Sequence, residues 1–433
     1  MNYRDTLFVN GSNKLVIGGI EASRLAKEYG TPLYVMDEQY IRDMCRAYAN
    51  ALKTYGGEKA LFASKAFSCK EIYRIIASEG FGADVVTGGE LYTALSAGLS
   101  PDKIYFHGNN KSAAEIDYAV KSGVYAIVAD CGSEIDIINE TAKKYNKTQN
   151  ILLRLNPGVN AHTHDFVQTA RVDSKFGFLI DGGIAANAVE KCLRSKNIKL
   201  SGVHTHIGSQ IFETEPFGAA ADKLCAFIKV VKDKYNYDIA ELNMGGGYAV
   251  YYTENDRKLK PEDYSVFIKA ICETINKCVE KSGIKKPSLT IEPGRSIVAE
   301  AGITLYTAGE TKEIKGLKKY VTTDGGMFEN PRFALYGAKY CAVKADDAGN
   351  TDTEIVTLAG KCCESGDLIA ENCRLPKVKR GDIIAVFTTG AYNYSMAGNY
   401  NRNFVPPVVF VKDGKARYAV KPQSFEDLVR NDV

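Results

Sequence analysis

The chain has 433 residues, of which 45% are hydrophobic, and its 55 basic and 52 acidic side chains leave a formal net charge of +3. This length exceeds one ordinary domain and predicts a large barrel with a second module. The near balance of charge argues against nucleic acid or an anionic membrane as the main partner. No run approaches the roughly 18 apolar residues of a membrane span, and the N-terminus lacks the apolar core of a secretion signal.

The chain contains 11 cysteines, an odd number, and no two of them are spaced as CxxC. In a chain of this size the pattern indicates reduced thiols in the cytoplasm. Cys362 and Cys363 are adjacent, and adjacent cysteines rarely form a disulfide with each other.

The N-terminal segment, residues 1–35, is predicted to form strands. Residues 6–19, "TLFVNGSNKLVIGG", are typical of a β-hairpin. We expect these strands to pack with a β-domain formed by the other end of the chain.

From about residue 60 the sequence alternates between short β-rich runs and stretches with apolar spacing near 3.6. The helical pattern is clear at residues 88–98 and 215–235. Eight alternations over roughly 240 residues favour a TIM-type (β/α)8 barrel over an open sheet, and we place this barrel at residues 36–300. The eight predicted strands are residues 60–66, 81–86, 103–108, 125–131, 150–157, 200–208, 239–247 and 288–295.

After residue 300 the helical spacing fades, and β-rich runs separated by turn residues replace it. Residues 411–415, "VKDGK", predict a hairpin with Asp413 and Gly414 at its turn. We therefore expect residues 301–433 to form a C-terminal β-sandwich or β-barrel domain, joined by the N-terminal strands.

Lys65 follows the apolar residues 61–63 at the end of the first predicted strand, where barrels carry their catalytic groups. A single lysine is most often an exposed or ion-paired side chain. At a strand end it is also placed to be a partly desolvated amine that forms a Schiff base. Lys70 and Lys175 are the alternatives, but neither lies at a strand end.

The seventh and eighth predicted strands end in residues suited to an anion. Gly245, Gly246 and Gly247 allow backbone N–H groups to approach an anion closely. Arg295, in "EPGR", can bind phosphate or carboxylate through two parallel hydrogen bonds. Since the loops after these two strands commonly bind phosphate in such barrels, the combination with Lys65 is more specific than three glycines alone.

The sixth predicted strand ends in "HTHIGSQ", and we expect His204 and His206 to share a face because they are two residues apart. His162 and His164 form a second pair after the fifth strand. No cysteine or acidic cluster accompanies these histidines, so we predict no metal site and favour a histidine stacked on a flat aromatic ligand. With the amine, the phosphate site and Glu292 as partner of a ring nitrogen, this set predicts a pyridoxal phosphate pocket suited to decarboxylation.

The chain also contains, in order, the segments "FASKAF", "GADVVTGGEL", "HTHIGSQ", "NMGGGY", "EPGRSIVAEAG", "CCESGD" and "GAYNYSMAGNYN". On these motifs it resembles the fold type III pyridoxal phosphate decarboxylases from about residue 30 to the C-terminus. The segments "CESGD", "RFALYGA" and "SMAGNYN" favour the diaminopimelate branch of that family. The chain departs from the usual motifs at four positions, none of them a proposed catalytic group: Ala170, Thr205, Phe333 and Gly398.

The resemblance implies that pyridoxal 5'-phosphate is held covalently by Lys65 and that Asp84 tunes this lysine. It implies that His206 stacks on the cofactor ring as a catalytic residue and that Glu292 pairs with the pyridine nitrogen. The other implied cofactor-binding residues are Ser209, Gly245, Gly246, Gly247, Pro293, Gly294, Arg295 and Tyr392.

The resemblance further implies a homodimer whose subunits share their active sites, with Cys363 crossing to the neighbouring subunit to donate the proton to Cα. The implied substrate-binding residues are Arg295, Arg332, Tyr336, Glu364 and Tyr392. The implied reaction is decarboxylation of meso-2,6-diaminopimelate to L-lysine and CO2, the last step of lysine biosynthesis. Arginines can clamp the distal carboxylate of this substrate, which ornithine and lysine lack.

Two alternatives remain open at this point. The first is a related decarboxylase for another basic or D-amino acid, such as ornithine, lysine, arginine or carboxynorspermidine. The second is a cofactor carrier or an inactive relative, which predicts loss of Lys65, Cys363 or Glu292, whereas all three are present.

Overall fold

The structure is a computed structural model that describes residues 2–159 and 174–433. These residues form two compact units. The barrel unit comprises residues 44–249 and 259–294, and the β unit comprises residues 1–43, 250–258 and 295–433. Among the described helices, none is long and apolar enough to cross a membrane.

The barrel unit is built on a closed ring of parallel strands, as the sequence predicts. The ring closes because β14 pairs with β6 and β9 pairs with β10, so no edge strand remains. In ring order the strands are β6 (Lys59–Ala63), β7 (Gly82–Val85), β8 (Ile104–Phe106), β9 (Ala126–Ala129), β10 (Gln149–Asn156), β12 (Ile198–His204), β13 (Glu241–Asn243) and β14 (Ser288–Ile291).

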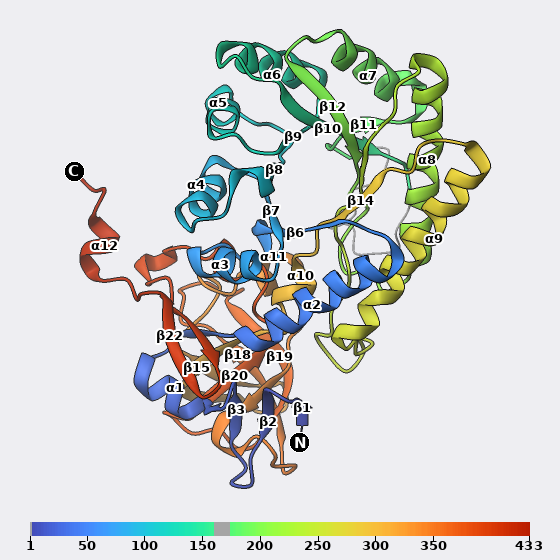
Figure 1. Cartoon of the computed structure of the whole chain (residues 1–433). Helices are drawn as coiled ribbons and strands as arrows, with labels where there is room; N and C mark the ends of the chain where they lie inside the picture. The colour runs from blue at the N-terminus through green and yellow to red at the C-terminus, as the bar shows by residue number, and fades with distance from the viewer. Residues whose placement is uncertain (1, 160–173) are drawn as a thin grey trace. The chain divides into compact units, whose positions relative to one another are not determined.

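Helices outside the ring cover the strands (Figure 1). Strands covered in this way are buried on both faces, which is why β7 and β9 are buried along their whole length. The two helices predicted from periodicity are α4 and α8, and α8 lies beside α9. The helices are α2 (Glu38–Tyr55), which begins in the β unit, and then α3 (Lys70–Ser78), α4 (Gly88–Ser96), α5 (Ala113–Ser122), α6 (Gly132–Lys144), α7 (Ile184–Arg194), α8 (Glu215–Tyr235) and α9 (Ser265–Ser282).

All eight predicted barrel strands are present, with ends that differ from the prediction by a few residues. Within the described part of the barrel unit, one further strand was not predicted. This is β11 (Phe178–Leu179), which pairs in parallel with the last two residues of β10 outside the ring. A two-residue strand is too short to produce a periodic signal in the sequence.

The β unit combines strands from both ends of the chain. Its nine-stranded sheet places β5 (Leu33–Asp37) between β15 (Gly302–Ile314) and β21 (Val408–Lys412). The other strands of this sheet are β16 (Lys318–Thr323), β17 (Ala342–Lys344), β18 (Glu354–Ala359), β19 (Leu368–Leu375), β20 (Ile383–Phe387) and β22 (Lys415–Val420). Its helices are α1 (Ala22–Tyr29), α10 (Arg295–Val298), α11 (Arg332–Tyr336) and α12 (Phe425–Val429).

The N-terminal hairpin joins the β unit through its side chains. Its strands belong to a separate four-stranded sheet: β1 (Asn2–Arg4), β2 (Leu7–Val9), β3 (Leu15–Ile17) and β4 (Ile20–Glu21). Leu7 and Leu15 are buried in one core with Leu305 and Val409 of the large sheet. The predicted hairpin between β21 and β22 is also present. Asp413 and Gly414 have φ of 50° and 72°, the left-handed conformation that a two-residue hairpin turn requires.

Candidate active site

Lys65 lies directly beyond the first barrel strand. β6 ends at Ala63, and a single 3-10 turn, Ser64–Ala66, carries the lysine with its two buried neighbours. Gly294 is needed for the close packing of this turn, because a Cβ there would lie 2.8 Å from the Cβ of Ala63. Lys65 is exposed in the chain taken alone. The turn places Lys65 beyond the end of β6.

Glu292 follows β14 and is buried, yet it is held as a carboxylate. It accepts hydrogen bonds from Asn243 Nδ2 at 2.7 Å and from His204 Nε2 at 3.1 Å. Its Oε1 also lies 2.9 Å from His107 Nε2. Burial alone would raise the pKa of Glu292, but His107 and His204 outweigh burial and hold the pKa well below its ordinary value.

His107 and His204 contact the same carboxylate but differ in basicity. Burial lowers the pKa of His107, but the charges of Asp84 and Glu292 outweigh it and raise the pKa above its ordinary value. Burial dominates at His204 and lowers its pKa to about 4. With Glu292, the two histidines are also metal-ligand types, with ligand atoms within 4.8 Å of one another. Of these atoms, His204 Nε2 and Glu292 Oε2 are hydrogen-bonded to each other.

Asp84, in β7, faces the same group of charges. Its Oδ1 lies 3.8 Å from His107 Nε2. Burial and the charge of Glu292 outweigh the opposing positive charges of His107 and Lys65, so the pKa of Asp84 is raised to about 6. The positive charge of Lys65 is thus one of those that act on Asp84; that Asp84 tunes this lysine stays a prediction.

The three glycines at residues 245–247 form a tight turn after β13. A Cβ at Gly246 would lie 2.1 Å from the backbone oxygen of Glu292, so no larger residue fits there without movement of the backbone. The amide of Gly245 donates to Asn243 Oδ1 at 2.9 Å, and the amide of Gly246 donates to His206 Nδ1 at 3.3 Å. The turn thus packs against the end of β14 and orients two polar side chains.

His204 and His206 have different partners, and the expectation that they share a face loses its basis in strand periodicity. β12 ends at His204, so strand periodicity does not extend to His206 in the following loop, which also carries Ser209. Desolvation, followed by the charges of Lys65 and Arg154, lowers the pKa of His206 well below its ordinary value. His162, His164 and Ala170 lie outside the described residues.

Several buried polar atoms near these strand ends, among them Asp84 Oδ1 and His204 Nδ1, have no hydrogen-bond partner among the described residues. Buried polar atoms without partners are costly, and a polar ligand would satisfy them. The ionised Glu292 suits a protonated ring nitrogen, and Lys65 supplies an amine at the same rim. The residues present therefore fit pyridoxal phosphate.

A second group of predicted residues lies in the β unit. Arg295 begins α10 and Arg332 begins α11, and both donate through Nη1 to the phenol oxygen of Tyr252, at 2.6 Å and 3.0 Å. The ring of Tyr392 lies with its centre 4.7 Å from Arg295 Cζ. Tyr392 has a φ of 61°, a left-handed conformation that is costly for a non-glycine residue and is typical of functional sites.

Tyr336, Cys363 and Glu364 are exposed residues of the β unit. Tyr336 ends α11, four residues after Arg332. Cys363 and Glu364 lie in the turn after β18, where the amide of Cys363 donates to Asn401 Oδ1 at 2.9 Å.

Sequence reasoning missed His107, Asn243 and Tyr252. His107 follows β8 directly and Asn243 ends β13, so their positions at strand ends are a signal that could have found them. Tyr252 carries no such signal, since it is one of 26 tyrosines and lies in no strand or helix.

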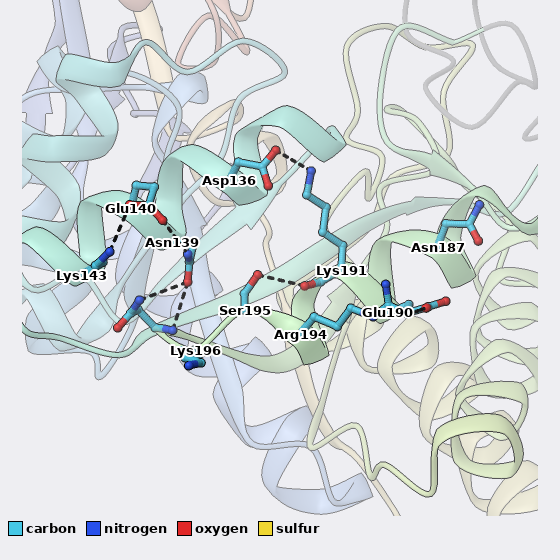
Figure 2. Close-up of a pocket in the computed structure, with 11 residues that line it drawn as sticks. Asp136, Asn139, Glu140, Lys143, Asn187, Glu190, Lys191, Arg194, Ser195 and Lys196 are labelled. Atoms are coloured by element: carbon cyan, nitrogen blue, oxygen red, sulfur yellow. Dashed lines mark hydrogen bonds and ion pairs between the residues drawn. The ribbon is translucent and has the colours of Figure 1, made fainter.

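A groove elsewhere in the barrel unit contains none of the predicted site residues. It lies between α6 and α7 and has a volume of about 680 Å³. Figure 2 shows its charged side chains in pairs, with Lys191 Nζ 2.5 Å from Asp136 Oδ2. Arg194 pairs in the same way with Glu190. These pairs are typical of a solvated helical surface.

Comparison with known proteins defines the class. A family model described as pyridoxal-dependent decarboxylase, pyridoxal binding domain, matches residues 39–299. The chain therefore belongs to the pyridoxal-dependent decarboxylases, whose cofactor is pyridoxal phosphate.

Full-length relatives define the branch. The chain is 44% identical to the diaminopimelate decarboxylase of Bacillus subtilis (strain 168), over 99% of this chain and 98% of the relative. It is 46% identical to the diaminopimelate decarboxylase of Staphylococcus aureus (strain COL), over 99% and 100%. A crystal structure of diaminopimelate decarboxylase from M. jannaschii in co-complex with L-lysine has a TM-score of 0.92 at 35% identity, over 99% and 98%. Within its class the chain belongs to the diaminopimelate decarboxylase family, as the motifs predict.

Proposed function

We propose that this protein decarboxylates meso-2,6-diaminopimelate to L-lysine and CO2 with pyridoxal phosphate as its cofactor. The observation that carries this proposal is the buried, ionised Glu292 at the barrel rim that also carries Lys65. When bound, pyridoxal phosphate supplies an electron sink for the carbon that loses CO2. The full-length relatives, which are diaminopimelate decarboxylases, support the choice of substrate.

Each residue of the barrel unit then has one task toward the cofactor. Lys65 Nζ would hold the cofactor covalently. Glu292 holds a proton at the ring nitrogen, because its pKa stays well below the ordinary value. His206 packs on the ring, and Asp84 tunes the charge at Lys65. The phosphate is held by Ser209, Gly245, Gly246, Gly247, Pro293 and Gly294, with Arg295 and Tyr392.

The β unit supplies the groups that recognise the substrate. Arg295 and Arg332 donate to one phenol oxygen, which places two positive charges close together for the distal carboxylate. Tyr336 and Tyr392 line the same substrate, and Glu364 pairs with its distal ammonium group. The thiol of Cys363 delivers the proton to Cα after CO2 has left.

We also propose that the active protein is a homodimer in which Cys363 and Glu364 serve the substrate of the neighbouring subunit. Both residues are exposed in the chain taken alone. Large apolar side chains are exposed in the same unit, among them Leu335 at 54% and Tyr400 at 45%. None of the eleven cysteines, all within the described residues, forms a disulfide, which supports a reducing, cytoplasmic location.

A substrate panel tests the function. CO2 release is measured with added pyridoxal phosphate from meso-diaminopimelate, L-lysine, L-ornithine and L-arginine. A site built to bind a second carboxylate should reject substrates that lack it by on the order of 10⁴-fold in kcat/KM. A higher kcat/KM for ornithine or lysine would instead support a decarboxylase for another basic amino acid.

Complementation tests the dimer. The variants Lys65→Ala and Cys363→Ala are each expected to be inactive as homodimers. If the two residues come from different subunits, half of the randomly mixed dimers contain one intact site, so about one quarter of wild-type activity should return. No recovery on mixing, with subunit exchange shown independently, would place both residues in one subunit's site.

A further inference from the structure

Tyr252 connects the two arginines of the β unit. Its phenol oxygen accepts hydrogen bonds from Arg295 Nη1 at 2.6 Å and from Arg332 Nη1 at 3.0 Å. The only other phenol bonded to Arg332 among the described residues is Tyr340, at a longer 3.2 Å. Tyr252 is therefore the acceptor that links both guanidinium groups.

One positive charge beside Tyr252, that of Arg332, is not matched by a carboxylate among the described residues. Arg332 is buried and has no carboxylate partner among the described residues; its recorded contacts are phenols and aromatic rings. Two guanidinium groups that share one acceptor repel each other, and a phenol oxygen offsets this repulsion only in part. A carboxylate carries a full negative charge, so it would offset more of the repulsion than a neutral phenol does, and it could form parallel hydrogen bonds with either arginine.

The phenol also has an unusual acidity. Desolvation alone would raise the pKa of Tyr252, but the charges of Arg295 and Arg332 and their hydrogen bonds outweigh it, so the pKa lies below its ordinary value. The other groups that face Tyr252 are the ring of Tyr340 at 5.8 Å and the carboxylate of Asp256, which accepts from the Tyr252 backbone amide at 3.1 Å. As pH rises, the phenol becomes an anion at the point where the arginines would bind a carboxylate.

We propose that Tyr252 is a positioning residue that determines specificity for a substrate with a second carboxylate. At neutral pH its oxygen holds Arg295 and Arg332 together as one receptor, and at alkaline pH its anion competes with the substrate carboxylate for that receptor. The inference deepens the proposed function and rests on it, because the distal carboxylate of diaminopimelate is the group that this receptor selects.

The test compares Tyr252→Phe with Tyr251→Phe in the holoenzyme. Both changes remove only a hydroxyl, but the Tyr251 hydroxyl forms no hydrogen bond with a described residue. At pH 7, Tyr252→Phe should raise KM for meso-diaminopimelate about tenfold, since the loss of one charge-assisted hydrogen bond is of this size. The inhibition constant of 1,5-diaminopentane, a diamine of similar length with no carboxylate, should change less than about twofold, and Tyr251→Phe should change neither value.

The pH profile separates positioning from a structural role. Only the wild type can form the competing anion, so the ratio of the KM of Tyr252→Phe to that of the wild type should fall as pH rises above 8. A KM unchanged by Tyr252→Phe would overturn the inference. So would a ratio independent of pH, or equal changes for diaminopimelate and 1,5-diaminopentane. If the wild type released no CO2 from diaminopimelate, the proposed function would fail separately, and calorimetric affinities of the same two ligands would still decide the role of Tyr252.

Discussion

Replacing Glu292 by glutamine tests whether this carboxylate sets the charge of its histidine neighbours. Glu292 Oε1 lies 2.9 Å from His107 Nε2. At an effective dielectric constant of about 20, a unit charge at roughly this distance contributes on the order of 4 kcal/mol. One pKa unit corresponds to about 1.4 kcal/mol, and Asp84 still faces His107 in the variant, so the pKa of His107 should fall by roughly one to three units.

Nuclear magnetic resonance of histidine Cε1 in the apoprotein measures this change, because the chain contains only five histidines. The variant His107→Gln assigns the signal. A suitable control is Glu134→Gln, which removes another buried carboxylate of the barrel unit that pairs with Lys111 at 2.9 Å and contacts no histidine in the described residues. An unchanged or higher pKa of His107 in Glu292→Gln would refute the assignment of Glu292 as its counter-charge.

Three further predictions concern His107, Gly246 and Glu241 of the barrel unit. The pKa of His107 is raised in the folded protein, so its protonation stabilises the fold below about pH 6.5, and this stability is lost as pH rises through the raised value. The difference in unfolding free energy between wild type and Glu292→Gln should therefore be larger at pH 6 than at pH 8.5. Chemical unfolding measures that gap, and a gap that grows with pH would contradict the prediction. Gly246→Ala should lower the unfolding free energy by about 1–3 kcal/mol and weaken cofactor binding, because the new Cβ would lie 2.1 Å from a backbone oxygen. The control Gly132→Ala places a Cβ with nothing within 4 Å and should have neither effect. Glu241→Gln, at the amino ends of the barrel strands, disturbs bonds to Tyr105 and Thr290 of 2.7 Å each, so it should cost about 2 kcal/mol of stability while leaving kcat/KM unchanged.

The barrel and its strand ends could be predicted because periodicity and turn residues are local signals. Lys65, Glu292 and the glycines at residues 245–247 stand at strand ends in the sequence, and in a closed parallel ring all carboxyl ends meet at one rim. The burial of strands on both faces makes each one a short apolar run that is easily recognised.

The partners of Glu292 could not be predicted in the same way. His107 and Asn243 reach it from strands that lie far away in the sequence, and this pairing depends on the ring order. The exposure of Lys65 depends on a single 3-10 turn, which leaves no periodic signal. The role of Tyr252 depends on two arginines that lie 43 and 80 residues away along the chain.

The proposed function requires that Lys65 is the amine that binds the cofactor at the rim shared with Glu292. Borohydride reduction of the holoenzyme fixes the cofactor on its lysine, and mass spectrometry of the digested protein identifies the modified peptide. We predict that the modification lies on Lys65 alone, and that the wild type, but not Lys65→Ala, releases CO2 from meso-diaminopimelate. A modification on Lys70, Lys111 or Lys175, or activity retained by Lys65→Ala, would contradict the account.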